Sequence, residues 1–252
     1  MIGPLIQGTA LGTFLLLGGA LPRERDQGIV TKDTVINVVN GLVLFGIKLA
    51  LIDAILAYLS MGWIDASALS EPWQQFVVAF LLLDFSRYWL HRAHHRVSFL
   101  WLFHRVHHMT ERLDATAGLR MHVVDFIQLA LLPSVLFGVL LETSTWPSWV
   151  LIAALSVGAV FDAFQHANLR WNCAHPVARV WGMLFNHPHF HAWHHVREGS
   201  RCDGNYGNTL VIWDRMFGTE VTGEELPEAL GLEPDQALRN DLLSMQLLRR
   251  PS

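Results

Sequence analysis

Five runs of hydrophobic residues, separated by polar segments, set the overall pattern of the chain. They cover residues 2–21, 35–61, 76–90, 125–141 and 149–164. A helix of about 20 apolar residues crosses the hydrocarbon core of a bilayer, and the last two runs, at roughly 17 residues, are near the lower limit. The pattern predicts four to five membrane-spanning helices, of which the last two are either full spans or a hairpin that enters from one side. The third helix can continue as far as His95.

The composition agrees with a membrane protein. Hydrophobic residues make up 52% of the chain and charged residues only 16%, whereas soluble domains carry about 25% charged residues. We therefore expect an all-α integral membrane helical bundle, a single domain over residues 1–252, with a cytoplasmic helical cap and a polar tail over 221–252. The net charge of −4 gives no sign of nucleic-acid binding. Two cysteines, Cys173 and Cys202, are too few for a disulfide framework or a cysteine-rich zinc site.

The positive charges predict which side of the membrane each loop occupies. If five spans alternate and the third ends with His91 in the cytoplasm, the cytoplasmic segments are 22–34, 91–124 and 165–252. All 18 Lys and Arg residues except Lys48 and Arg87 lie in these segments, as the positive-inside rule requires. This topology places every histidine on the cytoplasmic side of the membrane.

The histidines form three boxes with helical spacing. All 14 histidines lie between His91 and His195. The first box is His91-x-x-x-His95, the second is His104-x-x-His107-His108, the third is His191-x-x-His194-His195, and His166 stands alone. Residues at i, i+3 and i+4 share one face of a helix, and neutral imidazole is the commonest metal ligand among side chains.

These nine imidazoles predict a site for two metal ions. A single ion needs only about four to six ligands, so nine nitrogens suit a pair. Imidazole binds zinc, copper, iron and nickel alike, and spacing alone does not choose among them. Metal-bound histidines usually donate their other ring N–H to a nearby acceptor. The candidates for supporting roles around the metals are Asp84, His122, Asp162, Asn168, His187, His189 and Asp214.

The order of these motifs resembles the fatty acid hydroxylase and sterol desaturase superfamily of membrane di-iron enzymes. The resemblance covers residues 76–220. It rests on Asp84-x-x-x-Tyr-Trp-x-His91, the three boxes, His166-x-Asn168, Asn205-Tyr206-Gly207 and Trp213-Asp214-x-x-Phe217-Gly218-Thr219. The third box and the residues after it are most similar to bacterial members that look like alkylglycerol monooxygenase. The superfamily's Arg-x-His-Pro-x-Glu segment appears here as Arg120-Met-His122-Val-Val-Asp125.

The resemblance implies that the nine histidines bind two irons and that the protein oxidises a lipid C–H bond with O2. Either hydroxylation or desaturation fits. The chain has no nucleotide-binding fingerprint and no cysteine set for a haem or an iron–sulfur cluster. We therefore expect a separate electron donor, a ferredoxin, a cytochrome or a reductase.

The sequence leaves two other classes of function open. A membrane metal-ion transporter lined by histidines is the main alternative, although transporters usually place their ligands near the bilayer midplane and these boxes lie beyond the ends of apolar runs. A metal-dependent scaffold without catalysis is the other, and all three boxes are intact, which argues against it.

Overall fold

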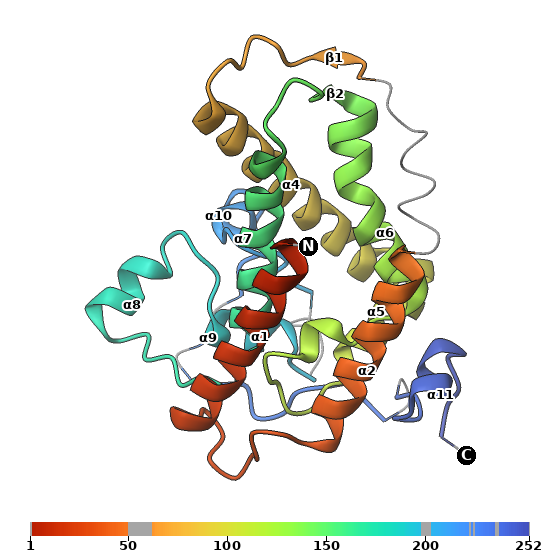
Figure 1. Ribbon diagram of the computed structural model, residues 1–252. Coiled ribbons are helices and arrows are strands. Elements are labelled where there is room, and N and C mark those ends of the chain that lie inside the picture. Colours follow the sequence, from red (N-terminus) through yellow and green to blue (C-terminus); the bar gives the residue numbers. More distant parts are fainter. Residues whose placement is uncertain are drawn as a thin grey trace.

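The fold is helical, as predicted. A computed structural model describes residues 2–49, 62–197, 203–221, 223, 225–234 and 237–251 (Figure 1). The long helices are α1 (Ile2–Ala20), α2 (Lys32–Ile47), α4 (Pro72–Arg96), α6 (Val123–Ser134) and α7 (Ser148–His166). The shorter helices are α5 (Ser98–His108), η2 (Ala117–Leu119), η3 (Val135–Leu140), α8 (Pro176–Trp181), α9 (Pro188–His194), α10 (Ile212–Met216) and α11 (Leu242–Gln246). Strands β1 (Ile64–Asp65) and β2 (Leu141–Glu142) form one short parallel pair.

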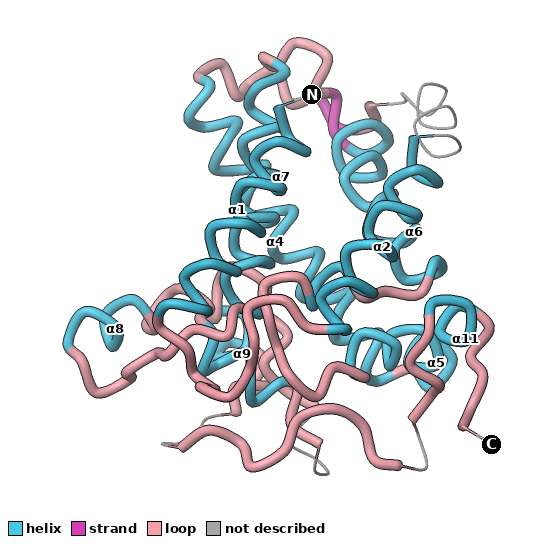
Figure 2. Tube along the Cα trace, turned by 60° about the horizontal axis from the view of Figure 1, so that its bottom comes forward, coloured by secondary structure: helices cyan, strands magenta, loops and turns pink. Residues whose placement is uncertain are grey.

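The long helices form a bundle, and the shorter ones collect at one of its ends. Helix α7 packs against both α1 and α4, and α6 contacts α4 and α5. Helices α5, α8, α9 and α11 lie at the end of the bundle opposite to the two strands (Figure 2). Near the strands, buried apolar side chains of α4, η3 and α7 form a core cluster that is the largest among the described residues and includes Leu83, Phe137 and Val150. This apolar cluster does not extend to the other end of the bundle.

Three of the described helices are long and apolar enough to cross a membrane. They are α1, the continuous stretch of α6 and η3 over Val123–Leu140, and α7. The predicted span at 76–90 lies inside α4, which does not meet the same criteria. The predicted span at 35–61 begins in α2, but its residues 50–61 lie outside the described residues.

Local sequence accounts for the ends of the helices that matter for the site. Helix α4 begins with Pro72, which suits the first helical turn because its missing N–H is not needed there, and continues to Arg96 as predicted. Val97 then has extended backbone, with φ −103° and ψ 109°, so α5 starts in a new direction. In α6, Pro133 removes a helical hydrogen bond and is followed by the wider π-helical turn η3.

The predicted tail at 221–252 packs onto the bundle end. Met245 of α11 and Leu238 are buried against Val106 of α5. The Gln246 side chain also accepts a 2.8 Å hydrogen bond from Val123 N at the start of α6. This part of the chain therefore contributes to the cap that covers the second histidine box.

Candidate metal centre

The nine predicted ligands come together in two neighbouring clusters. The first cluster consists of His91, His95, His104, His108 and His194, and the second of His107, His166, His191 and His195. Within each cluster, one ring nitrogen from every member lies within 4.8 Å of the others. The rings of His108 and His195 link the clusters, with centroids 4.5 Å apart. Two groups of four and five nitrogens match the expected pair of ions, although the ligand roles stay a prediction.

Four separate segments deliver these rings. The first box lies on the last turns of α4 and the second on α5, which are joined by Val97. His166 is the last residue of α7. The third box lies on α9, which has 7 residues and begins at Pro188, and on His195, its C-cap. The His187 side chain caps the start of α9 by accepting a 3.2 Å hydrogen bond from Phe190 N. The clusters therefore occupy the junction of the long helices with the cap.

Burial keeps five of the clustered histidines neutral. Desolvation, followed by the repulsion of neighbouring histidines, holds the pKa values of His107, His108, His191 and His195 well below the ordinary value of 6.5. Burial also lowers the pKa of His194 to about 3. A neutral ring has one nitrogen with a free lone pair, which is the form that binds a metal ion.

The hydrogen bonds of two rings indicate which ring nitrogen carries the proton and which carries the lone pair. His91 Nδ1 donates to the Tyr206 carbonyl at 2.9 Å, and His104 Nδ1 donates to Asp125 Oδ2 at 2.9 Å. With one proton on each ring, held at Nδ1 by these acceptors, the two Nε2 atoms present lone pairs to each other, and they lie 3.1 Å apart. Two facing lone pairs repel unless a cation lies between them. At metal–nitrogen distances near 2.1 Å, ligands at right angles are about 3 Å apart, so the spacing fits a shared ion.

The second cluster has the same spacing. His166 Nε2 lies 3.2 Å from His107 Nε2 and 2.9 Å from His191 Nε2, while His195 Nε2 is 3.1 Å from His191 Nε2. His166 Nδ1 donates to the Asp162 carbonyl at 2.6 Å, which leaves its Nε2 free for a metal. Both clusters therefore fit transition-metal ions that bind imidazole.

Most of the predicted supporting residues do not hydrogen-bond to the clustered histidine rings through their side chains. The Asp162 backbone carbonyl holds His166, but its carboxylate is 3.9 Å from the ring. Asp84 accepts from Thr209 N, Leu210 N and Trp213 Nε1, and Asp214 accepts from Tyr206 N, Gly207 N and Thr219 Oγ1. Both carboxylates therefore fix the 203–219 loop.

The remaining four supporting candidates stabilise local structure. His122 caps α6 and donates to the Gln246 carbonyl at 2.9 Å. His187 caps α9, and His189 Nε2 donates to the Gly223 carbonyl at 2.8 Å. Asn168 hydrogen-bonds to the backbone of Glu24 in both directions, at 2.9 and 3.1 Å. Their contacts position the segments that carry the predicted ligands.

Sequence reasoning missed the carboxylate that directly contacts the site. Asp125 is fully buried, and its two oxygens lie 2.9 Å from His104 Nδ1 and 3.1 Å from His94 Nδ1. These three residues form a third group of potential metal ligands. The signal was present, because Asp125 stands where the superfamily's segment ends in Glu.

The fold and this centre define a class: a helical protein with membrane-compatible helices and two adjacent histidine clusters that can hold metal. Residues 76–219, more than half of the chain, match the model of the fatty acid hydroxylase family. The chain therefore belongs to the fatty acid hydroxylase family, which confirms the resemblance.

Several curated relatives are enzymes that oxidise lipids. The chain is 33% identical over 168 residues to alkylglycerol monooxygenase of Xenopus tropicalis, covering 65% of this chain and 35% of that protein. It is 30% identical over 167 residues to ornithine lipid hydroxylase OlsE of Rhizobium tropici, with coverages of 65% and 46%. It is also 33% identical over 150 residues to fatty acid hydroxylase vlmA of Lecanicillium sp, with coverages of 55% and 40%. The chain thus spans less than half the length of these relatives. No solved structure matches it.

Proposed function

We propose that this protein is a di-iron membrane monooxygenase that hydroxylates a C–H bond of a lipid. The observation that supports this proposal is the pair of Nε2 atoms of His91 and His104, 3.1 Å apart, on rings whose Nδ1 atoms face the Tyr206 carbonyl and Asp125. The reaction consumes one O2, two electrons and two protons, and it gives the lipid alcohol and water. Desaturation of the same substrate is the alternative reaction.

The histidines would hold two irons, and family membership is what favours iron over the other metals that imidazole binds. When bound, the irons would supply O2 reduction and C–H oxidation. Asp125 and the carbonyls of Asp162, Gly204 and Tyr206 keep the rings in the metal-binding tautomer. Burial of the clusters excludes bulk water from the reacting centre.

The location of the clusters suggests how substrate and electrons arrive. The rings lie at the ends of α4 and α7, so a lipid tail can enter between the apolar helices while its polar end stays near the cap. We place the clusters on the cytoplasmic side of a bacterial inner membrane and assign the catalytic region to residues 76–220, with 221–252 as a cytoplasmic tail. A separate ferredoxin, cytochrome or reductase would deliver electrons, because the chain has no redox-cofactor motif of its own.

A metal-ion transporter is disfavoured by the same geometry. Transporters bind their ions near the bilayer midplane, whereas most of these histidines lie on α5 and α9, which are cap helices. The deciding experiment measures metal content and lipid products of the purified protein. About two irons per chain, with hydroxylated lipid that requires both O2 and a reductant, would support the proposal. Zinc flux in proteoliposomes without lipid oxidation would overturn it.

A further inference from the structure

The segments that follow α1 and α7 pair with each other near the histidine clusters, and we call this pairing the platform. The chain after α1 pairs with the chain after α7, with Pro22 opposite Leu169 in an antiparallel bridge. Arg23 N donates to the Asn168 carbonyl at 3.1 Å, and Arg170 N donates to the Leu21 carbonyl at 2.9 Å. Since α1 and α7 are both candidate spans, this pairing lies where each would meet the membrane surface.

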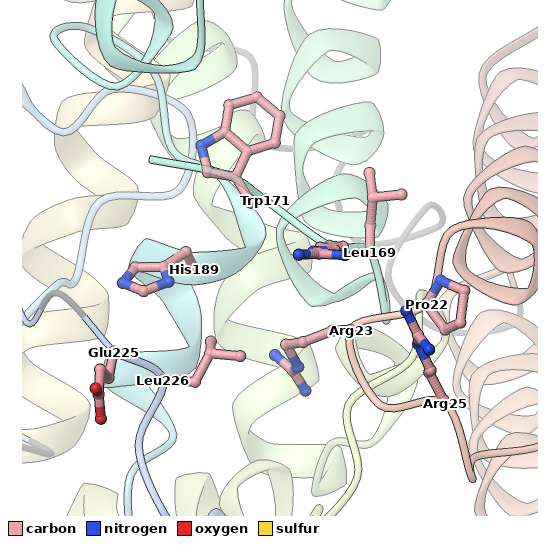
Figure 3. Close-up of a pocket in the computed structure, with 9 residues that line it drawn as sticks. Pro22, Arg23, Arg25, Leu169, Trp171, His189, Glu225 and Leu226 are labelled. Atoms are coloured by element: carbon pink, nitrogen blue, oxygen red, sulfur yellow. The ribbon is translucent and has the colours of Figure 1, made fainter. Parts of the chain in front are cut away.

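A pocket of about 480 Å³ opens on this platform (Figure 3). Its polar lining consists of Arg23, Arg25, Arg170, Trp171, His189 and Glu225. In Figure 3 the Arg23 side chain lies between Leu226 on one side and Pro22 and Arg25 on the other. Three guanidinium groups therefore share one pocket with one lining carboxylate.

Arg23 is the unusual member of this group. Its side chain is only 4% exposed, and its Nη2 lies 3.2 Å from Glu24 Oε1, on a carboxylate that is itself one-third exposed. Among the described residues, Arg23 Nη1 has no hydrogen-bond partner, and neither has the buried Nε1 of Trp171. A buried cation with an unused donor is costly unless a ligand satisfies it. Even counting Glu24 and Glu225 against the three arginines, the pocket retains a positive charge.

The pocket is close to the metal centre along the chain. Leu169 follows His166 by three residues, and His189 precedes His191 by two residues on α9. A polar group in the pocket would thus be held at the membrane boundary, while an attached apolar tail could reach the helices.

We propose that this pocket binds the anionic group of a lipid headgroup, a phosphate or a carboxylate. Arginine forms paired, charge-assisted hydrogen bonds with such groups, and basic pockets at the membrane surface suit anionic headgroups. The inference rests on the proposed function, because it makes the lipid substrate an anionic one and uses the pocket to place it beside the clusters.

The test measures lipid binding to the purified full-length protein by native mass spectrometry in neutral detergent. Probes are a short-chain phosphatidic acid, the diacylglycerol with the same chains, and inorganic phosphate. We expect one phosphatidic acid per chain, weaker binding of diacylglycerol, and weak competition by inorganic phosphate. Arg23→Gln should lower phosphatidic acid affinity about tenfold or more, since charge-assisted bonds are lost.

Two further variants keep the result interpretable. The double variant Arg25→Gln, Arg170→Gln changes exposed residues only, so its lipid binding can be read even if Arg23→Gln fails to fold. Arg179→Gln, an exposed arginine of α8 outside the pocket, is the matched control and should bind like the unmodified protein. Equal affinity for phosphatidic acid and diacylglycerol, or normal affinity in the double variant, would overturn the proposal. Displacement by equimolar inorganic phosphate would make the ligand a free anion instead.

Iron content, activity and lipid binding of a His194→Ala variant distinguish this inference from the proposed enzymatic function. His194→Ala should lose iron and activity but bind phosphatidic acid normally, because the residue lies in the first cluster and not in the pocket. A protein that binds phosphatidic acid without hydroxylating any lipid would contradict the proposed function alone. A protein that hydroxylates lipids without preferring anionic ones would contradict the pocket alone.

Discussion

Replacing Asp125 with asparagine tests whether a single buried carboxylate aligns the first cluster. In the structure each of its oxygens faces a different ring, His104 Nδ1 at 2.9 Å and His94 Nδ1 at 3.1 Å. An asparagine of the same shape keeps one acceptor oxygen but places an NH2 group where the other oxygen was. The remaining oxygen can still accept from His104 Nδ1, but as a neutral acceptor, and the NH2 group replaces Oδ1, which has no hydrogen-bond partner in the described structure. His104 is then held less firmly in its position and tautomer.

The size of the effect follows from these contacts. Hydrogen bonds to a charged acceptor contribute about 1.5–3 kcal/mol and those to a neutral one about 0.5–1.5 kcal/mol. Losing the charge at His104 therefore costs about 1–1.5 kcal/mol. This overlaps the lower end of the 10–100-fold loss of metal affinity typical when such an outer partner is changed, which is about 1.4–2.7 kcal/mol.

The assay titrates metal-free protein with Fe(II) under anaerobic conditions against a competing chelator, and size-exclusion chromatography confirms that the variant is folded. Asp162→Asn is the matched control. It also removes a carboxylate near a ligand ring, but His166 is held by the backbone carbonyl at 2.6 Å while the carboxylate is 3.9 Å away. A similar loss of iron affinity in both variants, or none in Asp125→Asn, would refute the positioning role.

Three further predictions concern the ligands, the loop anchor and the response to pH. His107→Ala and His194→Ala each remove a ring from one cluster, so both should lose activity and bound iron yet insert into the membrane, whereas the exposed His175→Ala should behave like the unmodified protein. Asp84→Asn disturbs three hydrogen bonds of 2.9–3.1 Å and should lower the unfolding free energy by about 1–3 kcal/mol, measured as a reduced Tm. An unchanged Tm would contradict that anchoring role. Burial lowers the pKa of both His187 and His194 from 6.5 to about 3, so the unfolded chain binds more protons below pH 6.5, and metal-free protein should lose stability as pH falls from 7 to 5. A flat Tm over this range would show that these rings are not buried as neutral groups.

The sequence predicted the parts of this molecule that depend on neighbouring residues. Helical spacing within each box is local, and so is the continuation of α4 past the apolar run to Arg96. The division of the boxes between clusters depends on tertiary packing and was not predictable. His104 and His108 of α5 turn to the first cluster, while His107 belongs to the second. A 3.6-residue turn directs i+3 and i+4 to slightly different sides, so this short helix supplies both clusters.

The supporting contacts were harder to predict because backbone carbonyls have no sequence signature. The sequence pointed to carboxylates, and among the residues described Asp125 is the carboxylate that accepts from the ring of a predicted ligand at hydrogen-bond distance. His91, His166 and His194 instead donate to the carbonyls of Tyr206, Asp162 and Gly204. Whether a carbonyl faces a ring depends on the path of its loop, which only the fold determines.

That path gives Asp84 and Asp214 an indirect role at the histidine clusters. The carbonyls of Gly204 and Tyr206 face His194 and His91, and Asn205 between them has a left-handed φ of 58°, a conformation that asparagine tolerates better than most residues.

Asp214 holds this turn by accepting from Tyr206 N and Gly207 N, both at 2.8 Å. Asp84 fixes the continuation of the loop through Thr209, Leu210 and Trp213. The loop motifs after the third box are therefore part of the histidine site, because they set the acceptors that fix ring tautomers in the first cluster. Substitution of either aspartate should therefore disturb the tautomer of His91 and His194, although neither carboxylate hydrogen-bonds to a ring.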